Sequence, residues 1–597
     1  MHTLRIAVIV SVVAVGCVSP ESAPRPTPEP VAASDTQPLM SFRPVVGGHL
    51  LVTADGQHVA MADVEGDRLR VYTLNPAALE YEVALPEKSW PTRVIEGHHG
   101  EFHVLLRGAG SIATVINRTV SVTSVCPEPR GLALASSTDE LVVACAGGEV
   151  VRVIDRKVTE LSNTGVEWRD VAFTPAGGLT GTSFRSAEVI TLTDGHTVSS
   201  RLKVPAQRLD LTPGKNTLHQ GQVAWRMVPA GAKTFLIHQL HADQLVVNGI
   251  DGGFSPNGPA QGTNPYGGGL STVPGQLVGC SNSAVVTAIS TIENGVVMSV
   301  QRTNDVLPVD AALSPDGKQL AVVGAGGTGL SIYPVQSLSF SPCLIATAGL
   351  TGLALNSVAW LSPTRVVVIE SLRAAPLMFD LSTGQSRSFG ADADRGSAAH
   401  ALFHLAPRGG APLACASCHP EGGEDGHTWV IDGKPRRTQT LAGGVMKRMP
   451  FHWRGDLSNL DTLMSDTFVK RMGGSALQFD QVSTLGAWLD TIPAPRPSRR
   501  LDEAQLLAGR GAFDKAQCSS CHFAHGTQKG SSNDIGTGES VRAPSLLGLF
   551  ARAPYLHTGQ IPDIRSRVTG GLHPQHGSLG RLDAAEREQL ISYLESL

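Results

Sequence analysis

Hydrophobic and polar residues largely alternate along the first two thirds of the chain. The alternation is clear in residues 68–74, 150–155 and 188–192, and Gly, Asp and Pro separate such runs. A period of two is typical of short β-strands with one buried face, and the separating residues favour turns. The pattern therefore predicts an all-β region.

A repeated unit runs through this region. An aliphatic strand, a turn containing Pro, Asp or Gly and a second hydrophobic strand recur in residues 131–144, 170–177, 311–323 and 357–369. Copies spaced at roughly 40 to 50 residues are typical of β-propeller blades. We expect a propeller of about seven blades over residues 41–385, similar to the WD40-like and lactonase-like propellers of secreted bacterial proteins. Residues 249–275, rich in Gly, Asn and Pro, are expected to form a long loop.

Two C-x-x-C-H runs follow the repeats. They consist of Cys415, Cys418 and His419, and of Cys518, Cys521 and His522. This spacing is the attachment signature of c-type haem, in which two thiols bind the porphyrin and the histidine is the proximal iron ligand. A zinc site or a redox dithiol would explain one run, but two runs favour two covalently bound haem c groups.

Matching helices flank the two runs. Residues 394–404 and 501–513 are predicted as leading helices, residues 485–492 and 590–597 as closing helices, and residues 493–497 as a Pro-rich linker. The sequence therefore predicts a multidomain chain: a propeller followed by two all-α domains of the class I cytochrome c type, at residues 390–495 and 500–597.

The N-terminus indicates export. A short cationic start and an apolar run too short to cross a bilayer predict a signal peptide over residues 1–17, and Cys17 lies in a lipoprotein-type cleavage box. Residues 18–40 are expected to be a Pro-rich tether. These features predict a lipid-anchored protein of the periplasm or outer envelope, with the membrane bound through the anchor only; ordinary secretion with Cys17 removed is the alternative.

The remaining cysteines are even in number. Cys126, Cys145, Cys280 and Cys343 permit two disulfides in an oxidising compartment. Cys126 and Cys145 are close enough in sequence to bridge neighbouring strands, which leaves Cys280 for Cys343. The net charge of −4 excludes a nucleic-acid partner.

The second axial ligands follow from aligning the two copies. Residues 450–455 correspond to residues 554–559, so Trp453 matches His557, and the same register places Met472 opposite His576. Met472 and His576 are the candidate distal ligands, although each could be an ordinary core or surface residue. The rival ligands are Met446, Met449, His557 and His573.

Three features resemble the bacterial di-haem cytochrome c peroxidase family: the paired C-x-x-C-H runs, residues 450–455 and residues 553–559. The resemblance covers about residues 390–597. The resemblance implies one haem that relays electrons, one that reacts with hydrogen peroxide, an acidic residue and a Gln that assist O–O cleavage, and a Trp between the haems. Trp429 and Trp453 are candidates for that Trp, with ordinary core packing as the alternative that is expected for at least one of them. The chain departs from the family because no Met follows His557 at the expected place, and none of Glu421, Glu424 and Asp425 can be assigned as the acid.

Three functions remain open on the sequence. The first is a peroxidase-like di-haem oxidoreductase that takes electrons from a redox partner protein and uses hydrogen peroxide. The second is an electron-transfer di-haem cytochrome whose propeller docks a partner, and the third is a scaffold in which the propeller binds a ligand. Catalytic residues are not assigned, and the propeller fold does not decide between these functions.

Overall fold

The computed structural model describes residues 43–597 apart from 195–196, 213–214, 246–279, 281–282, 340–342, 345–346, 391–394, 432, 523–531, 572 and 574. The predicted signal peptide with Cys17, the tether and the loop at residues 249–275 lie outside the described residues. In the part of the chain that is described, no helix combines the length and apolar character needed to cross a membrane.

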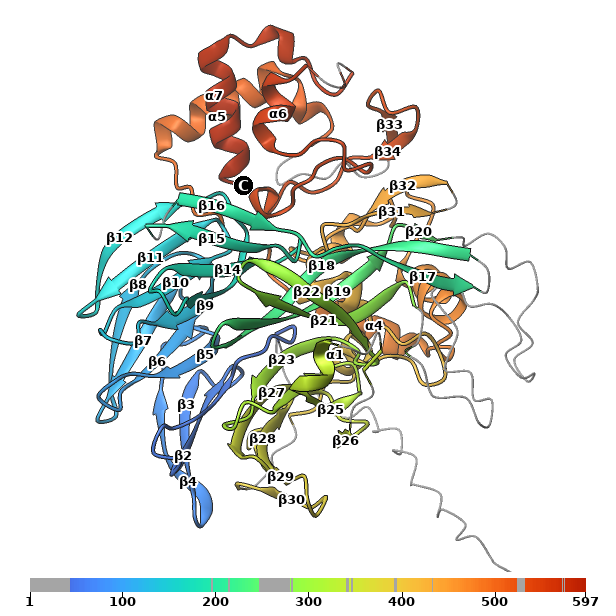
Figure 1. Cartoon of the computed structure of the whole chain (residues 1–597). Coiled ribbons are helices and arrows are strands. Elements are labelled where there is room, and N and C mark those ends of the chain that lie inside the picture. The colour runs from blue at the N-terminus through green and yellow to red at the C-terminus, as the bar shows by residue number, and fades with distance from the viewer. Residues whose placement is uncertain are drawn as a thin grey trace, which may run out of the picture. The chain divides into compact units, whose positions relative to one another are not determined.

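Seven antiparallel sheets make up the first part of the described chain (Figure 1). In each sheet the strands pair in chain order, as in a meander. The first three sheets are β1–β4 (Leu50–Val52, His58–Asp63, Arg68–Leu74, Ala77–Ala84), β5–β8 (Pro91–Glu96, Phe102–Leu106, Ser111–Ile116, Thr119–Ser124) and β9–β12 (Pro129–Leu134, Leu141–Cys145, Glu149–Ile154, Lys157–Asn163).

The remaining four sheets continue the same plan. They are β13–β16 (Trp168–Phe173, Leu179–Ser183, Val189–Thr193, Thr197–Leu202), β17, β18, β19, β21 and β22 (Gln207–Thr212, Lys215–Ala230, Lys233–Ala242, Val285–Glu293, Val296–Thr303), β23–β26 (Pro308–Leu313, Gln319–Gly324, Gly329–Pro334, Thr347–Gly349) and β27–β30 (Leu355–Ser362, Arg365–Glu370, Leu377–Asp380, Ser386–Ser388). The 3-10 helix η1 (Val335–Ser339) follows β25.

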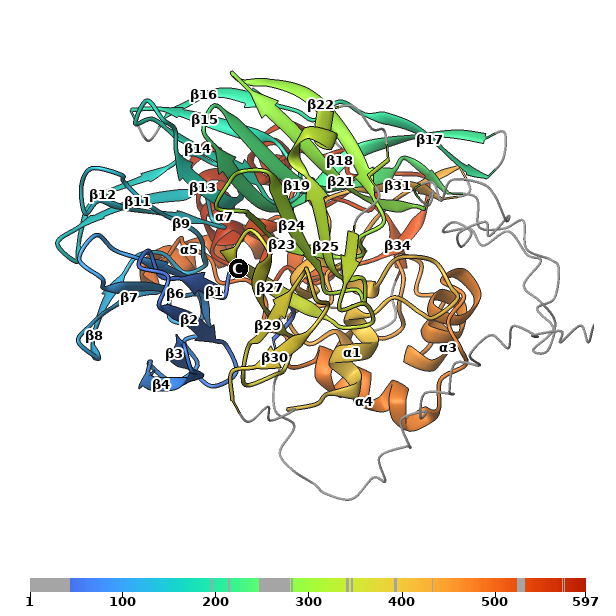
Figure 2. The same ribbon diagram turned by 60° about the horizontal axis from the view of Figure 1, so that its bottom comes forward.

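The sheets pack face to face around a closed ring. The second strands β6 and β10 are buried throughout, whereas the outer strands β8 and β16 are largely exposed. One hydrophobic cluster lies between each pair of neighbouring sheets, and a seventh joins β27–β30 back to β1–β4. Figure 2 shows the sheets following one another around this ring.

The ring is closed by hydrophobic packing between its last and first sheets. The rings of Tyr72 and Phe389 lie 5.8 Å apart, centre to centre, at this closure. The described sheets agree with the expectation of about seven blades, and β30 extends the all-β region slightly beyond residue 385. Both predicted disulfides are present, Cys126–Cys145 and Cys280–Cys343.

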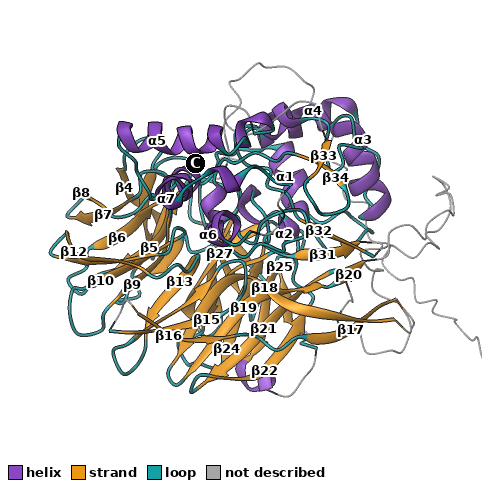
Figure 3. Cartoon of the chain, turned by 90° about the horizontal axis from the view of Figure 1, so that it is seen from above, coloured by secondary structure: helices purple, strands orange, loops and turns teal. Residues whose placement is uncertain are grey.

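The helices gather on one side of the strands (Figure 3). We call residues 398–492 the first helical half and residues 503–597 the second helical half. The first contains α1 (Ala398–His404), α2 (Cys415–Cys418), η2 (Pro420–Gly422), η3 (Val445–Arg448), α3 (Leu460–Met464), the π-helix η4 (Ser465–Arg471) and α4 (Phe479–Leu489). The second contains α5 (Glu503–Lys515), η5 (Cys518–Ser520), η6 (Leu549–Ala551), α6 (Ile564–Thr569), η7 (Leu579–Arg581) and α7 (Ala584–Glu595).

Local sequence explains where the long helices of the second half begin. Asp502 and Asp583 accept hydrogen bonds from the backbone N–H groups of Gln505 and Glu586, at 2.8 Å and 2.9 Å, at the starts of α5 and α7. These are reciprocal capping boxes, which satisfy backbone donors that the helix itself leaves unpaired. The two predicted leading helices and two closing helices are all present, with slightly different ends.

The expectation of purely helical halves is wrong. The first half contains the hairpin β31–β32 (Thr428–Ile431, Lys434–Arg437) and the second contains β33–β34 (Ser532–Asp534, Ser540–Arg542). In addition, β20 (Gln244–Leu245) leaves the propeller and pairs in parallel with β31. Periodicity in windows of ten or more residues does not detect strands this short.

One hydrophobic core continues from the propeller into the first helical half. It includes Trp225 and Leu245 from the propeller region and Phe403, Trp429 and Trp488 from the first half. The second half has a core of its own around Phe513 and Leu590. The first half is therefore built against the propeller, and the second is packed mainly within itself.

Candidate haem sites

The first C-x-x-C-H run borders a large cavity. Cys415, Cys418 and His419, all on or beside α2, line a cavity of about 620 Å³. This volume lies in the range of roughly 300–1,000 Å³ that is usual for cofactor and ligand sites. Much of the rest of the wall is apolar, from Phe403, Leu413, Trp429, Phe451, Leu460, Leu463, Phe468, Leu485 and Leu489.

Two thioethers also line this cavity. Met472, at the end of the π-helix η4, is 3% exposed, and Met464, at the end of α3, is 5% exposed. The structure thus brings the predicted ligand Met472 to the same cavity as His419. Met464 was not found by sequence reasoning, because a methionine on a helix more often fills a core than binds a metal.

The imidazole of His419 is oriented for binding through one nitrogen. Its Nδ1 lies 3.2 Å from the carbonyl oxygen of Gly423, so a proton on Nδ1 is donated to that carbonyl and Nε2 is left as the ligand atom. Burial lowers the pKa of His419, although Asp425 partly opposes this shift. The ring is therefore neutral, as a metal ligand must be.

The thiols of the first run have raised pKa values. Burial raises the pKa of Cys415 to about 11 and that of Cys418 well above its ordinary value. A redox dithiol needs a lowered thiol pKa, so the raised pKa values do not favour a redox pair. Within the described ranges, no group of three or more His, Cys, Asp or Glu is placed to hold a metal ion.

The second run has the same proximal arrangement. Nδ1 of His522 lies 3.1 Å from the carbonyl oxygen of Pro544, and burial lowers the pKa of His522 to about 4. The neutral ring therefore presents Nε2. Burial likewise raises the pKa of Cys518 to about 11.

His576 faces His522. The centres of the two rings lie 6.2 Å apart. His522 and His576 would therefore be the two imidazoles available to a haem iron at the second run. Burial, with Arg567 and His522 as further causes, lowers the pKa of His576 to about 3, so this ring is neutral too.

Arg567 limits how His576 can act. Nε of Arg567 lies 3.3 Å from Nδ1 of His576. A guanidinium only donates, so Nδ1 accepts in this arrangement and the proton of the neutral ring is on Nε2. Binding of iron through Nε2 then requires this proton to leave or the contact with Arg567 to change.

The rival ligands are placed less favourably. Met446 and Met449 do not line the 620 Å³ cavity, and Met449 is 37% exposed. His557 is buried beside Trp453, at 5.9 Å between ring centres, and Nδ1 of His573 lies 3.3 Å from the carbonyl oxygen of Gly536. Trp429 and Trp453 both line the cavity.

The loops at residues 450–455 and 554–559 are structural copies. Phe451 and Tyr555 donate their backbone N–H groups to Leu457 and Ile561, each at 2.6 Å. His452 and Leu556 both have φ of 67°, and Gly455 and Gly559 have φ of 71° and 68°. The register that the sequence alignment gave is therefore present in the backbone.

Each half also donates hydrogen bonds from one arginine to the other half. We call these two residues, Arg437 and Arg542, the exchanged arginines. The backbone N–H of Arg437 donates to the carbonyl of His557 at 2.9 Å, and that of Arg542 donates to the carbonyl of Trp453 at 2.8 Å. Nη1 of Arg437 contacts the carbonyls of Arg552 and Pro554 in the second half. Nη1 of Arg542 contacts the equivalent carbonyls, of Arg448 and Pro450, in the first half.

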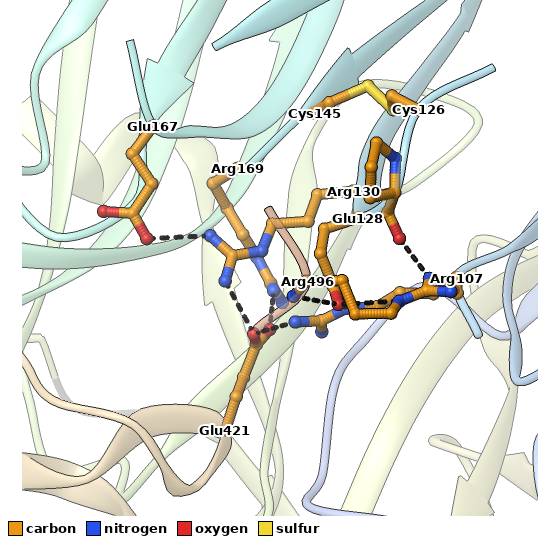
Figure 4. Close-up of polar contacts among 10 residues, drawn as sticks. Arg107, Cys126, Glu128, Arg130, Cys145, Glu167, Arg169, Glu421 and Arg496 are labelled. Carbon is orange, nitrogen blue, oxygen red and sulfur yellow. Dashed lines mark hydrogen bonds and ion pairs between the residues drawn. A yellow bond between two sulfur atoms is a disulfide. The ribbon is translucent and has the colours of Figure 1, made fainter. Parts of the chain in front are cut away.

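Glu421 ties the first run to the propeller. Its carboxylate lies 2.7 Å from Nη2 of Arg107, 3.1 Å from Nη2 of Arg130 and 2.5 Å from Nη1 of Arg169 (Figure 4). Burial raises the pKa of the Glu421 carboxyl, but the three arginine charges outweigh burial and hold it well below its ordinary range. Glu128, Glu167 and Arg496 extend this cluster.

The other two acids after the first run are also paired. Glu424 lies 2.6 Å from Arg437 and 2.6 Å from Arg552. Asp425 lies 3.4 Å from Nδ1 of His241 and accepts the backbone N–H of His427; burial alone would raise its pKa, but His241 and His427 lower it. Glu421 and Asp425 are thus held as carboxylates, and neither has the raised pKa of a general acid.

Comparison with known proteins identifies part of the chain. Residues 506–597, which contain Cys518, Cys521, His522 and His576, match the family model of cytochrome c. The second helical half is therefore a cytochrome c domain, a redox module that carries one covalent haem c. The match does not reach the first C-x-x-C-H run, and it is to cytochrome c in general rather than to di-haem peroxidases.

Solved structures resemble the chain only distantly. Hydrazine synthase of Kuenenia stuttgartiensis is 14% identical with a TM-score of 0.39 and covers 60% of this chain and 98% of its own. Hsv2 of Kluyveromyces lactis is 14% identical (TM-score 0.33; 57% and 93%), and virginiamycin B lyase of Staphylococcus aureus is 11% identical (TM-score 0.28; 60% and 86%). These scores support no inference about activity. No curated protein matches the chain.

Replacement of Glu421 tests the contact between the first C-x-x-C-H run and the propeller. The Glu421→Gln variant should lose about 3–5 kcal/mol of stability at neutral pH, because three buried guanidinium groups lose their shared carboxylate. Since the folded state lowers the pKa of Glu421, its contribution is present above the ordinary value of 4.5 and is lost as the pH falls below it. Chemical denaturation at several pH values measures both effects.

The matched control is Glu588→Gln, which breaks an exposed pair with Arg565. It should leave the denaturation midpoint unchanged, because exposed pairs contribute little. Equal midpoints for the Glu421 variant and the wild type would show that the contact between the first C-x-x-C-H run and the propeller does not depend on this carboxylate.

Proposed function

We propose that the protein is a di-haem electron-transfer protein in which Cys415, Cys418 and His419 hold a haem in addition to that of the cytochrome c domain. The observation that carries the proposal is the 620 Å³ cavity, which has this C-x-x-C-H run and Met472 in its wall. The donor set fits the group: two cysteines for the thioether bonds, one neutral imidazole and a thioether sulfur.

The internal repeat supports the same conclusion. The loops at residues 450–455 and 554–559 have matching hydrogen bonds and backbone angles, and the two proximal histidines both present Nε2. One copy belongs to the cytochrome c domain. A duplicated backbone with a duplicated attachment run is the expected result of duplicating a haem domain.

Electron transfer follows from the axial ligands. A haem with ligands on both faces mainly passes electrons, whereas an open iron can bind peroxide. Met472 is buried in the cavity of the first run, and His576 lies 6.2 Å from His522 between ring centres. Both sites therefore contain a candidate sixth ligand, although His576 first has to lose its Nε2 proton or its contact with Arg567, and the chain's residues would orient the haems, exclude water and set the charges around them.

Peroxide-dependent oxidation is the second candidate, and one observation favours it. Arg567 contacts Nδ1 of His576, which leaves the proton on Nε2 and makes His576 a poor ligand in that arrangement. The iron of the second haem would then be open, with a cation close by. This alternative would make the protein a peroxidase-like oxidoreductase.

We further propose that the chain works outside the cytoplasm, anchored by lipid on Cys17, with a redox partner protein. The disulfides Cys126–Cys145 and Cys280–Cys343 support an oxidising compartment, because such bonds are rare in the cytosol. Attachment of c-type haem in bacteria takes place in the same compartment.

The number of covalent haems tests the proposal directly. The wild-type protein, matured with haem-attachment machinery, should carry two haems, and the double variants Cys415→Ala/Cys418→Ala and Cys518→Ala/Cys521→Ala should each carry one. Intact-mass spectrometry and haem absorbance per chain measure the count. One haem in the wild type, lost only with Cys518 and Cys521, would contradict the proposal.

The distal ligand of the first haem is tested by Met472→Ala. Loss of the thioether should convert one of the two haems from low spin to high spin, which absorption spectra of the oxidised protein detect. Met464→Ala is the control, because Met464 lines the same cavity and is similarly buried. If Met464→Ala alone gives the change, Met464 and not Met472 is the ligand.

Electron paramagnetic resonance separates the two candidate functions. The oxidised wild-type protein should show two low-spin signals that hydrogen peroxide leaves unchanged, because Met472 and His576 would each supply the iron with a second protein ligand. A high-spin signal that disappears on peroxide addition would instead support the peroxidase-like function. Repeating the measurement after half-reduction tests for an iron that opens only in that state.

A further inference from the structure

The exchanged arginines differ in one contact. Arg437 and Arg542 are 6% and 8% exposed, and their backbone N–H and Nη1 groups make equivalent hydrogen bonds to the opposite half. Nη2 of Arg437 lies 2.6 Å from Glu424. Among the described residues, Nη2 of Arg542 reaches only the carbonyl of Met449, at 3.4 Å. One member of a duplicated pair therefore has a carboxylate and the other does not.

In sequence, the second half has no acid at the position equivalent to Glu424. Glu424 follows the first run by a few residues, and the corresponding stretch after His522 reads Phe-Ala-His-Gly-Thr-Gln-Lys-Gly-Ser, without an acid. Among the residues that the structure describes, Arg542 forms no ion pair, and burial lowers its pKa. A buried guanidinium without a counter-charge is costly unless a ligand supplies one.

Arg542 lies in the wall of the cavity that the first run borders. Most other cations in this wall already have carboxylates in the protein: Lys434, Arg436 and Arg454 with Glu539, Arg471 with Asp466, and Arg437 and Arg552 with Glu424. Arg448, whose backbone carbonyl accepts from Arg542, has only carbonyl partners for its own side chain among the described residues. Arg542 and Arg448 are therefore cations of this wall that form no ion pair among the described residues.

We propose that Arg542 binds a carboxylate of the ligand in this cavity, namely a propionate of the haem held by Cys415 and Cys418. The inference rests on the proposed function, because it requires a haem at the first run. A guanidinium fork suits a carboxylate, and such charge-assisted bonds are short and strong. The cation comes from the second half, so the cytochrome c domain supplies part of the binding site of the other haem.

The charge of Arg542 has a measurable electrochemical consequence. Reduction adds one negative charge to the haem, and a nearby cation in a poorly solvated site stabilises the reduced form. Arg542 therefore raises the reduction potential of the first haem. Glu424 pairs with Arg437 as well as with Arg552, whereas no carboxylate pairs with Arg542 among the described residues, so the two exchanged arginines act unequally.

Redox titration of the full two-haem protein tests the assignment. Arg542→Gln should shift one of the two reduction potentials to lower values, and this haem should be the one whose spectrum changes in Met472→Ala. Arg454→Gln is the matched control, because Arg454 lies in the same wall but is half exposed and paired with Glu539, so its shift should be much smaller. Unchanged potentials in Arg542→Gln, or a larger shift in Arg454→Gln, would overturn the assignment.

A second measurement covers the case in which Arg542→Gln does not accumulate. Arg542→Lys keeps the charge but replaces a fork with a single ammonium group. Reduction-induced infrared spectra with ¹³C-labelled propionates should show a shifted carboxylate band in this variant and none in Arg454→Gln. An unshifted band in Arg542→Lys would exclude a propionate as the partner.

Two other outcomes are distinguishable. If Arg542→Gln leaves both potentials unchanged but abolishes a spectral response of the first haem to added acetate, the carboxylate is a small free acid and the propionate assignment is overturned. A wild-type chain with a single haem would refute the proposed function itself. Two haems with unshifted potentials would refute the role of Arg542 alone.

Discussion

The structure depends on holding one buried carboxylate among three guanidinium groups. Glu421 lies two positions after His419, and its partners Arg107, Arg130 and Arg169 come from three successive sheets of the propeller. Buried charges are tolerated only when they are paired and hydrogen-bonded. The pairing therefore fixes the segment that carries the first C-x-x-C-H run against the ring of sheets.

This constraint makes the propeller and the first helical half one structural unit. Their hydrophobic core is continuous, β20 pairs with β31, and Leu245 at the end of β20 lines the 620 Å³ cavity together with Cys415. The sequence pattern changes near residue 390, but the hydrophobic core continues across this boundary. A propeller that only docked a partner would not need to supply part of the cavity wall.

Features that are determined by residues close together in sequence could be predicted. Alternation and repeat spacing indicated the sheets, and the C-x-x-C-H runs and the register of Met472 with His576 were found from local motifs. The roles of Glu421 and Glu424 could not be found in this way, because their arginine partners lie far away in sequence. Met464 was missed for another reason: nothing in its local pattern separates a cavity methionine from a core methionine.

The duplicated halves share a backbone but differ in charge. Residues 450–455 and 554–559 keep the same turn because hydrogen bonds and glycines at positive φ set it, and side chains are free to diverge around it. Glu424 pairs with both Arg437 and Arg552, whereas Arg542 and Arg448 form no ion pair among the described residues. Under the proposed two-haem assignment, this difference in charge would give the haems unequal potentials, which is the condition for electrons to move preferentially from one to the other.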